Sequence, residues 1–230
     1  MIEKIPSHIA IVPDGNRRYA QAHGLPTLEG HRRGAEVMHT VVDYLIDHNL
    51  RYLTTWGFST DNWKRKDSEV NDLLHLLATW IEKDGLWLHE MGVRLRHIGR
   101  LQGLPGFLQL AINKAAELTK ENTGMTLALA FNYSGRAELV DVVHNWLLDE
   151  SAPQHLDEKS FSHYLYTDGM PDVDLVIRTA GEFRLSNFLL WQTAYSEFFF
   201  TEVLWPDFGT EELEKALQVY RARQRRFGGD

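Results

Sequence analysis

The stretch from Asp174 to Glu197 reads DLVIRTAGEFRLSNFLLWQTAYSE, and it gives the clearest indication of the fold. Val173 to Ile177 is a short apolar run and Gly181 interrupts it, so we expect a buried strand that ends in a turn. Polar side chains follow directly. This order is typical of an open α/β sheet, in which ligands bind beyond the carboxyl ends of the strands.

The side chains after this strand include Arg178, Arg184 and Ser186. Two forked guanidinium groups and a hydroxyl on one turn favour the binding of clustered phosphate oxygens, as in a diphosphate. Glu197 closes the segment as a candidate metal ligand. The alternative is that both arginines only pair with Glu182 and other surface acids.

A second apolar run, His8 to Pro13, predicts another strand and ends at the group Asp14-Gly15-Asn16-Arg17-Arg18-Tyr19. A carboxylate among phosphate-binding groups is repelled by the ligand unless a divalent cation bridges the two. Asp14 beside Arg17 and Arg18 therefore indicates magnesium, which prefers one or two carboxylates together with substrate oxygens. An ordinary Asp-Gly turn is the alternative.

Gly30 to Gly34 forms a further polar cluster, in which His31 and two arginines stand at the apparent start of a helix through Val41 to Ile46. The positive end of a helix dipole favours an anion at such a position. A purely structural histidine is the alternative.

Tyr52 to Phe58 predicts a strand, and several polar or aromatic side chains follow it. They are Ser59, Thr60, Asp61, Asn62, Trp63, Lys64 and Arg65. A helix cap at Asp61 and a core position for Trp63 are the alternatives to a binding role.

Strand-like and helix-like segments alternate along the rest of the chain, and no linker or repeat divides it. We therefore expect one α/β domain over residues 1–230. The further expected strands are Val93 to Ile98, Met125 to Phe131 and Phe198 to Val203, and the expected helices are Glu69 to Met91, Gly106 to Glu121, Gly135 to Leu148 and Glu211 to Arg226.

Composition narrows the functional classes. With 230 residues and 43% hydrophobic content, the chain can fill one sizeable core. A net charge of −8 argues against a nucleic-acid binder.

The lack of cysteine excludes disulfides and thiol catalysis and favours a cytoplasmic location. Any metal must then be bound by oxygen atoms. The amino terminus lacks the apolar stretch of a signal peptide, and no run reaches the length needed to span a bilayer.

Taken together, the polar segments resemble those of the cis-prenyltransferases, the Z-type isoprenyl diphosphate synthases typified by undecaprenyl diphosphate synthase. The likeness covers nearly the whole chain, in the order and approximate spacing of every signature segment. The matching elements are D-G-N-x-R at Asp14 to Arg18, G-H-x-x-G at Gly30 to Gly34, F-S-x-x-N-W-x-R at Phe58 to Arg65, I-R-T-x-G-E-x-R-x-S-N-F-L-L-W-Q at Ile177 to Gln192, and W-P-D-F at Trp205 to Phe208.

The resemblance implies a mostly parallel central sheet flanked by helices, with a hydrophobic tunnel. It also implies an enzyme that condenses an allylic diphosphate with isopentenyl diphosphate, forms a Z double bond and releases pyrophosphate. The resemblance further implies that the enzyme uses Mg²⁺ and forms a homodimer. A long isoprenoid product is expected to bring it into peripheral contact with membranes. A non-catalytic scaffold subunit and a magnesium-dependent phosphohydrolase with Asp14 as nucleophile are the rival interpretations. The arginine clamp is present, and Asp14 is not part of the Asp-x-Asp pair that a hydrolase of this kind would need.

The resemblance assigns roles to individual residues. Asp14 is expected to be catalytic and to bind the metal with Glu197, and Asn62 is linked in this family to the loss of a proton. Arg178, Arg184 and Ser186 are expected to hold isopentenyl diphosphate. The full set of expected substrate-binding residues is Gly15, Asn16, Arg17, Arg18, Tyr19, His31, Ser59, Thr60, Asp61, Trp63, Arg65, Arg178, Arg184, Leu185 and Ser186.

The chain departs from the family pattern at a few positions. Thr27 stands where bacterial long-chain enzymes usually have an arginine, and Arg17 stands where many members have glycine. We expect Arg17 to replace part of the missing charge. Tyr19 keeps an aromatic ring where tryptophan is common, and Phe183 removes a metal contact that a histidine would offer. Candidates for the tunnel wall are Trp56, Gly57, Trp80, Trp87 and Leu127, and the tail from Arg225 to Gly229 is expected to reach across a dimer interface.

Overall fold

The computed structural model describes residues 5–223 of the chain. In this part of the chain, six strands form one sheet in the order β3-β4-β2-β1-β5-β6, and every neighbouring pair is parallel. The expected α/β class is therefore confirmed, with a sheet that is entirely parallel. The strands are β1 (His8–Val12), β2 (Tyr52–Ser59), β3 (Arg94–Ile98), β4 (Thr126–Tyr133), β5 (Leu175–Arg178) and β6 (Glu197–Phe200).

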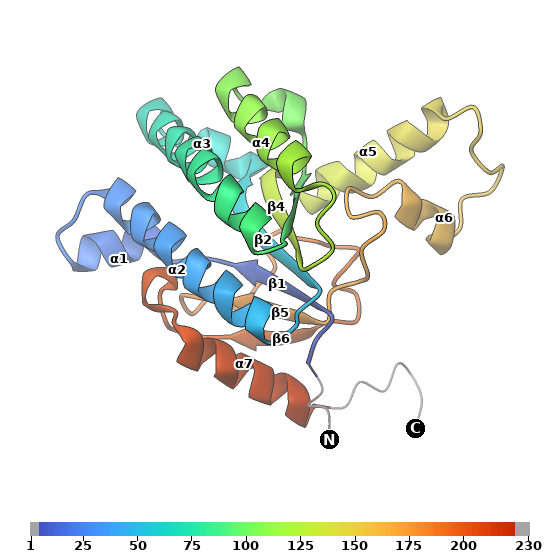
Figure 1. Cartoon of the computed structure of the whole chain (residues 1–230). Helices are drawn as coiled ribbons and strands as arrows, with labels where there is room; N and C mark the ends of the chain where they lie inside the picture. The colour runs from blue at the N-terminus through green and yellow to red at the C-terminus, as the bar shows by residue number, and fades with distance from the viewer. Residues whose placement is uncertain (1–4, 224–230) are drawn as a thin grey trace.

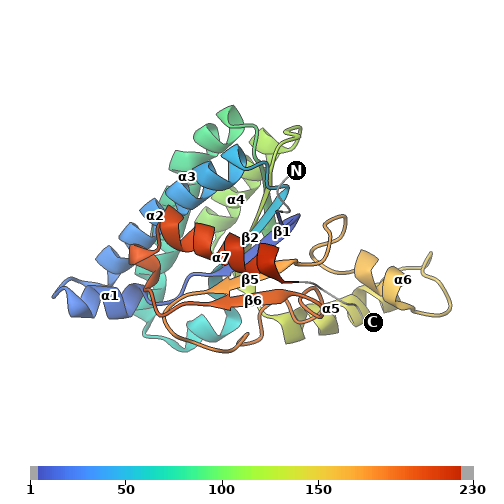
Figure 2. The same cartoon turned by 90° about the horizontal axis from the view of Figure 1, so that it is seen from below.

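Helices cover both faces of the sheet, as a parallel sheet requires. Figure 1 and Figure 2 show α2, α3, α4 and α7 on one side, with α5 and α6 on the other. The α-helices are α1 (Asn16–Ala22), α2 (Thr27–Asp47), α3 (Asp67–Glu90), α4 (Gly106–Thr119), α5 (Gly135–Leu148), α6 (Glu158–His163) and α7 (Thr210–Ala222), and three short 3₁₀ helices are η1 (Thr60–Lys64), η2 (Leu101–Gly103) and η3 (Trp205–Asp207).

The core divides between the two faces of the sheet because successive strand residues point to opposite sides. Ile9 and Ile11 of β1 pack with the large cluster under α2, α3, α4 and α7, whereas Ala10 and Val12 pack with a smaller cluster that includes Phe188. All five residues of β1 are buried, so this strand lies in the middle of the core. Its carboxyl end therefore places the next residues at a fixed point of the sheet edge.

Most expected elements are observed with ends shifted by one or two residues, and a few differ in ways that bear on the site. Helix α2 begins at Thr27, directly after Pro26, so His31 lies in its second turn and not at its start. Strand β6 begins at Glu197 and ends at Phe200, whereas we expected Phe198 to Val203. Helix α6 was not expected, although Asp157 and Ser160 form a capping box that marks its beginning.

Two expectations extend past the part of the chain that can be described. The predicted helix from Glu211 to Arg226 is observed as α7, which ends at Ala222, and the proposed tail from Arg225 lies outside the described residues. Among residues 5–223, every helix is too short or too polar to cross a membrane.

Candidate active site

A cavity of about 630 Å³ lies between the sheet and helices α2 and α3, and it reaches the carboxyl ends of β1, β2 and β5. Charged and polar side chains line its part near the sheet edge. The rest is apolar, so the cavity suits a molecule with an anionic head and a hydrocarbon chain. The apolar part includes Met38 of α2, Leu73, Leu76, Leu77 and Trp80 of α3, and Leu129 of β4.

The candidate tunnel residues divide into two groups. Trp56, Gly57 and Trp80 line the cavity as expected. Trp87 does not, because its ring lies against His39 with centroids 3.9 Å apart. Leu127 is fully buried in the main core and does not line the cavity.

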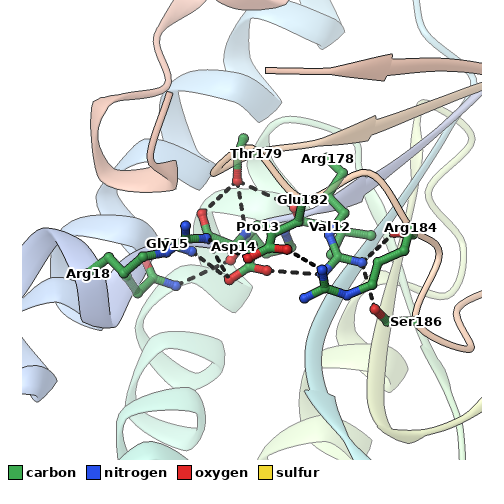
Figure 3. A network of polar contacts seen from close by, with 11 residues as sticks. Val12, Pro13, Asp14, Gly15, Arg18, Arg178, Thr179, Glu182, Arg184 and Ser186 are labelled. Carbon is green, nitrogen blue, oxygen red and sulfur yellow. Dashed lines mark hydrogen bonds and ion pairs between the residues drawn. The ribbon is translucent and has the colours of Figure 1, made fainter. Parts of the chain in front are cut away.

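Asp14 is fixed by the strand that precedes it and by Thr179. Strands β1 and β5 are paired with Val12 opposite Arg178, so both chain segments leave the sheet side by side. The Thr179 hydroxyl accepts a hydrogen bond from the Asp14 amide (2.9 Å) and donates one to its carbonyl (2.7 Å). Thr179 is completely buried, so water does not compete with its hydroxyl for these two hydrogen bonds. Figure 3 shows the resulting network.

Gly15 allows the chain to turn immediately after Asp14. Its φ is 109°, and an added Cβ would lie 3.0 Å from Cδ2 of Leu204 and 3.1 Å from Cβ of Ala180. Both the left-handed backbone and the close neighbours favour glycine. The Gly15 amide donates to Oδ1 of Asp14 at 2.8 Å, which orients the carboxylate.

The guanidinium of Arg178 joins the two loops. Nη2 lies 3.0 Å from Oδ2 of Asp14, while Nη1 donates to the Ser186 hydroxyl at 2.9 Å and to the Arg184 carbonyl. The Arg178 side chain is only 5% exposed. A buried charge of this kind is held rigidly because its hydrogen bonds replace its hydration.

Glu182 connects the remaining arginines. Its carboxylate pairs with Arg184 of the same loop and, at 3.4 Å, with Nη2 of Arg18 in α1. The alternative expectation, an ion pair between Arg184 and Glu182, is thus observed. The partner of Arg178, in contrast, is Asp14. In this arrangement, cationic groups from α1 and from the loop after β5 lie around one end of the cavity.

The glycines of the segment 30–34 serve close packing and not helix initiation. An added Cβ at Gly30 would lie 2.1 Å from the Asn16 carbonyl oxygen, and one at Gly34 would lie 2.4 Å from Asn16 Oδ1. Helix α1 can approach α2 this closely only because Gly30 and Gly34 have no side chains. The contact places His31 in the cavity wall beside α1.

His31 is neutral near pH 7. Burial lowers its pKa to about 4, and the charges of Arg65 and Arg17 act in the same direction. Its Nε2, together with Oδ1 of Asn16 and Nε of Arg178, is buried without a hydrogen-bond partner. All three residues line the cavity, so unpaired polar atoms lie at its end near the sheet edge.

Helix η1 explains which residues after β2 reach the cavity. A 3₁₀ helix has three residues per turn, so positions i, i+3 and i+6 share one side. Ser59, Asn62 and Arg65 accordingly line the cavity. Thr60 and Trp63 instead line a second hollow, with the Trp63 indole donating to Asn132 at 2.9 Å. The third face carries Asp61, which pairs with Lys64 in solvent.

Several expected site residues are not brought to the cavity. Thr60, Asp61 and Trp63 are directed elsewhere by η1. Tyr19 is buried and stacked on His23, with centroids 4.1 Å apart, and Leu185 packs against the smaller core cluster.

Glu197 requires the largest correction. It is the first residue of β6 and stands opposite Leu175 at the amino end of β5, whereas Asp14 follows the carboxyl end of the neighbouring strand. Its carboxylate pairs with Arg223 at 2.8 Å. Within one chain, Glu197 therefore cannot share a metal ion with Asp14.

Sequence reasoning also missed residues that the structure places in the site. Glu69 of α3 pairs with Arg65 at 3.2 Å and with Arg17 at 3.6 Å, which fixes two cations at the cavity. Gln21 lies one turn after Arg17 and Arg18 on α1 and also lines the cavity. The sequence could have predicted this position, because Gln21 is four residues after Arg17 and residues four apart share a helix face.

The whole chain is similar to known proteins of one family. The family model described as "Putative undecaprenyl diphosphate synthase" matches residues 12–228. An isoprenyl transferase of Heliobacterium mobile is 48% identical, covering 98% of this chain and 88% of that protein. An isoprenyl transferase of Thermotoga maritima is 46% identical and covers 98% of both.

Solved structures agree with the sequence comparison. Lavandulyl diphosphate synthase from Lavandula x intermedia, in complex with dimethylallyl diphosphate, superposes with a TM-score of 0.94 at 36% identity, covering 97% of this chain and 98% of that one. A probable undecaprenyl diphosphate synthase from Campylobacter jejuni gives a TM-score of 0.83 at 30% identity, covering 98% and 99%. The fold, the cavity and these similarities together identify the chain as a prenyltransferase of the undecaprenyl diphosphate synthase family.

Proposed function

We propose that this prenyltransferase condenses an allylic prenyl diphosphate with isopentenyl diphosphate, forms a Z double bond and releases pyrophosphate. The observation that carries the proposal is the meeting of cationic side chains from α1 and from the end of β5 and its following loop at one end of a cavity that is otherwise apolar. The group around Asp14, Arg17, Arg18 and His31 would bind the allylic diphosphate, and its hydrocarbon chain would lie against Leu77 and Trp80.

Arg178, Arg184 and Ser186 would hold isopentenyl diphosphate beside it. Ionisation of the allylic carbon–oxygen bond develops negative charge on the leaving pyrophosphate, and preorganised cations stabilise that charge more in the transition state than in the ground state. Holding the isopentenyl double bond about 3 to 3.5 Å from the allylic carbon would lower the barrier further, because the two reacting groups would already be oriented. Asn62, which lines the same cavity, is the candidate for assisting proton loss.

Asp14 fits the magnesium ion that the family implies. Its side chain is 38% exposed, and Oδ1 accepts a hydrogen bond from the Gly15 amide and lies 4.0 Å from Nη2 of Arg18. No group of three acidic or histidine side chains within residues 5–223 could hold a metal alone. Magnesium commonly takes one carboxylate with water and phosphate oxygens, so this donor set is sufficient when substrate is bound. When bound, the ion would neutralise charge on the diphosphate.

A substrate panel tests the proposal. Purified protein would be incubated with labelled isopentenyl diphosphate and with dimethylallyl, geranyl, farnesyl or geranylgeranyl diphosphate, and the products would be sized and their double-bond geometry determined. Dimethylallyl diphosphate alone tests for linkage between two allylic units. Chelation should stop the reaction and Mg²⁺ should restore it. Phosphate release without chain growth would instead support a hydrolase.

A homodimer is part of the same proposal. Strand β6 is an edge strand, and its last residue, Phe200, contacts Phe183 with tilted rings whose centroids are 5.3 Å apart, although Phe183 is 72% exposed. Exposed aromatic rings at a sheet edge favour a protein partner. Light scattering of the wild type and of Phe183→Glu tests whether a second copy covers this edge.

A cytoplasmic enzyme that meets membranes through its product completes the proposal. The lack of cysteine supports a reducing compartment. Fractionation of cells with and without substrate starvation would test both the compartment and the membrane contact.

A further inference from the structure

The loop that carries Arg184 and Ser186 has an unusual backbone. Ser186 and Asn187 are consecutive residues with positive φ, 52° and 72°. Residues other than glycine adopt this left-handed conformation at a cost, although asparagine tolerates it best. Two such residues in succession persist only where surrounding contacts hold them.

The holding contacts come from Asn187 and reach the start of α5. The Asn187 carbonyl accepts from the Gly135 amide at 2.8 Å, and Oδ1 accepts from the Arg136 amide at 2.8 Å. Nδ2 donates to the Ser134 hydroxyl at 2.7 Å. The first amides of a helix have no partners within that helix. Asn187 therefore caps α5 from a segment that is distant in the sequence.

The start of α5 is shaped to receive this side chain. Ser134 is the N-cap residue, yet it makes no capping hydrogen bond of its own, because its hydroxyl accepts from Asn187. An added Cβ at Gly135 would lie 3.1 Å from the Asn187 carbonyl oxygen and 2.8 Å from Cγ of Leu190. Glycine thus permits the close approach of the loop.

The same loop also positions the buried arginine. Ser186, the neighbour of Asn187, accepts a hydrogen bond from Arg178 at 2.9 Å, and Arg178 contacts Asp14 at 3.0 Å. A shift of the loop would therefore move the hydroxyl and the carbonyl that orient the guanidinium. The path runs from α5, on one face of the sheet, to the cavity under α2 and α3 on the other.

We propose that Asn187 is a positioning residue that pins the Arg184–Ser186 segment to the start of α5 and so sets the geometry of the isopentenyl diphosphate site. The inference rests on the proposed function for the identity of the ligand. It does not require Asn187 to touch the substrate.

The test compares Asn187→Ala with Asn187→Asp, which keeps the acceptor for Arg136 but cannot donate to Ser134 when ionised. Thr193→Ala is the matched control, because it removes the hydrogen bond from the Thr193 hydroxyl to the Leu189 carbonyl in the same loop and keeps the three bonds between Asn187 and the start of α5. We expect Asn187→Ala to raise the KM for isopentenyl diphosphate at least tenfold and the KM for the allylic diphosphate less than twofold. Asn187→Asp should lie between, and Thr193→Ala should leave both constants near those of the wild type.

Loss of stability alone would lower the active fraction and leave both KM values unchanged, and that result would overturn the inference. Equal increases in both constants would also overturn it. Amide hydrogen exchange separates this inference from the proposed function, since it needs no turnover. Exchange at Gly135, Arg136 and Phe188 should accelerate in Asn187→Ala, and unchanged exchange overturns the pinning role even if the wild type transfers no prenyl group.

Discussion

The two loops that carry the cationic site are built in opposite ways. The first consists of Pro13, Asp14 and Gly15 between β1 and α1, whereas the second spans residues 179–196 between β5 and β6. The first is so short that its flanking strand and helix fix its course. The second must return to the amino edge of the sheet because β5 and β6 are parallel, and it does so without a regular helix.

This difference separates chemistry from substrate placement. A short loop between two buried elements can hold a carboxylate rigidly with few contacts of its own. A long loop depends on side chains elsewhere, here on α5 and on Arg178. Changes in the first loop should therefore affect turnover most, and changes in the second should affect binding of one substrate.

The largest effect is expected in the short loop, for Asp14→Ala. Because the carboxylate is the only acidic group oriented by this turn, we expect kcat to fall at least about 100-fold, with substrate binding largely retained. Product formation measures kcat, and calorimetry measures binding. Asp14→Asn keeps the shape without the charge and should be similarly inactive. Normal turnover in a folded Asp14→Ala protein, verified by circular dichroism, would remove the proposed mechanism.

The next effect is expected where the long loop meets the short one, at Arg178. Its fork bonds Asp14, Ser186 and the Arg184 carbonyl together, and a lysine ammonium cannot reproduce that geometry. Arg178→Lys should raise the KM for isopentenyl diphosphate by about 10-fold to 100-fold and cost about 1–3 kcal/mol of unfolding free energy.

Arg184→Lys is the matched control, because the Arg184 side chain is 59% exposed and that of Arg178 is 5% exposed. We expect its KM to rise less than that of Arg178→Lys and its stability to stay near that of the wild type. Steady-state kinetics and chemical denaturation measure both quantities. Equal effects at the two arginines would contradict the difference between a buried, hydrogen-bonded Arg178 and an exposed Arg184.

The same contrast explains what the sequence could predict. Asp14 lies two residues after the apolar strand β1, and Arg178 is the last residue of β5. Parallel strands bring their carboxyl ends to one edge, so the proximity of the two residues could be inferred. Glu197 could not be placed, because an irregular loop leaves no periodicity from which to count the return to the other edge. The anchor at Asn187 was hidden for the same reason.

Within η1 the error has a different cause. Ser59, Asn62 and Arg65 were predicted together with Thr60 and Trp63, since all lie close in sequence. Only the turn type separates them. With three residues per turn, every third side chain faces the same way, so Ser59, Asn62 and Arg65 reach the cavity while Thr60 and Trp63 reach the second hollow. The sequence contains that spacing, but it does not distinguish a 3₁₀ turn from an extended loop.

A smaller effect is expected from Arg17, which extends the short loop into α1. If Arg17 replaces charge lost at Thr27, Arg17→Gly should raise the KM for the allylic diphosphate about twofold to fivefold, since its side chain is 58% exposed and solvent screens it. Adding Thr27→Arg to this variant should restore the constant. Steady-state kinetics with varied allylic substrate provides the measurement, and an unchanged KM in Arg17→Gly would exclude compensation.

The smallest effect concerns stability beside the short loop, where His31 is buried against α1. Its pKa in the folded protein is about 4, below the ordinary value of 6.5, and burial is the main cause. Between these values the unfolded chain binds a proton that the folded chain does not, so the free energy of unfolding falls as pH decreases from 6.5 to 4. The slope from one such group is at most about 1.4 kcal/mol per pH unit.

His31→Gln removes this contribution and should make the decline shallower, although His8 and His97, with similarly lowered pKa values of about 4, will maintain part of it. The comparison therefore uses the slope of unfolding free energy against pH in wild type and variant, and not absolute stability. Arg65, Arg17 and Glu69 are the charged groups that act on His31, and both proteins contain them. Parallel slopes would mean that His31 is hydrated in solution, and the wall beside the short loop would then be less rigid than its packing indicates.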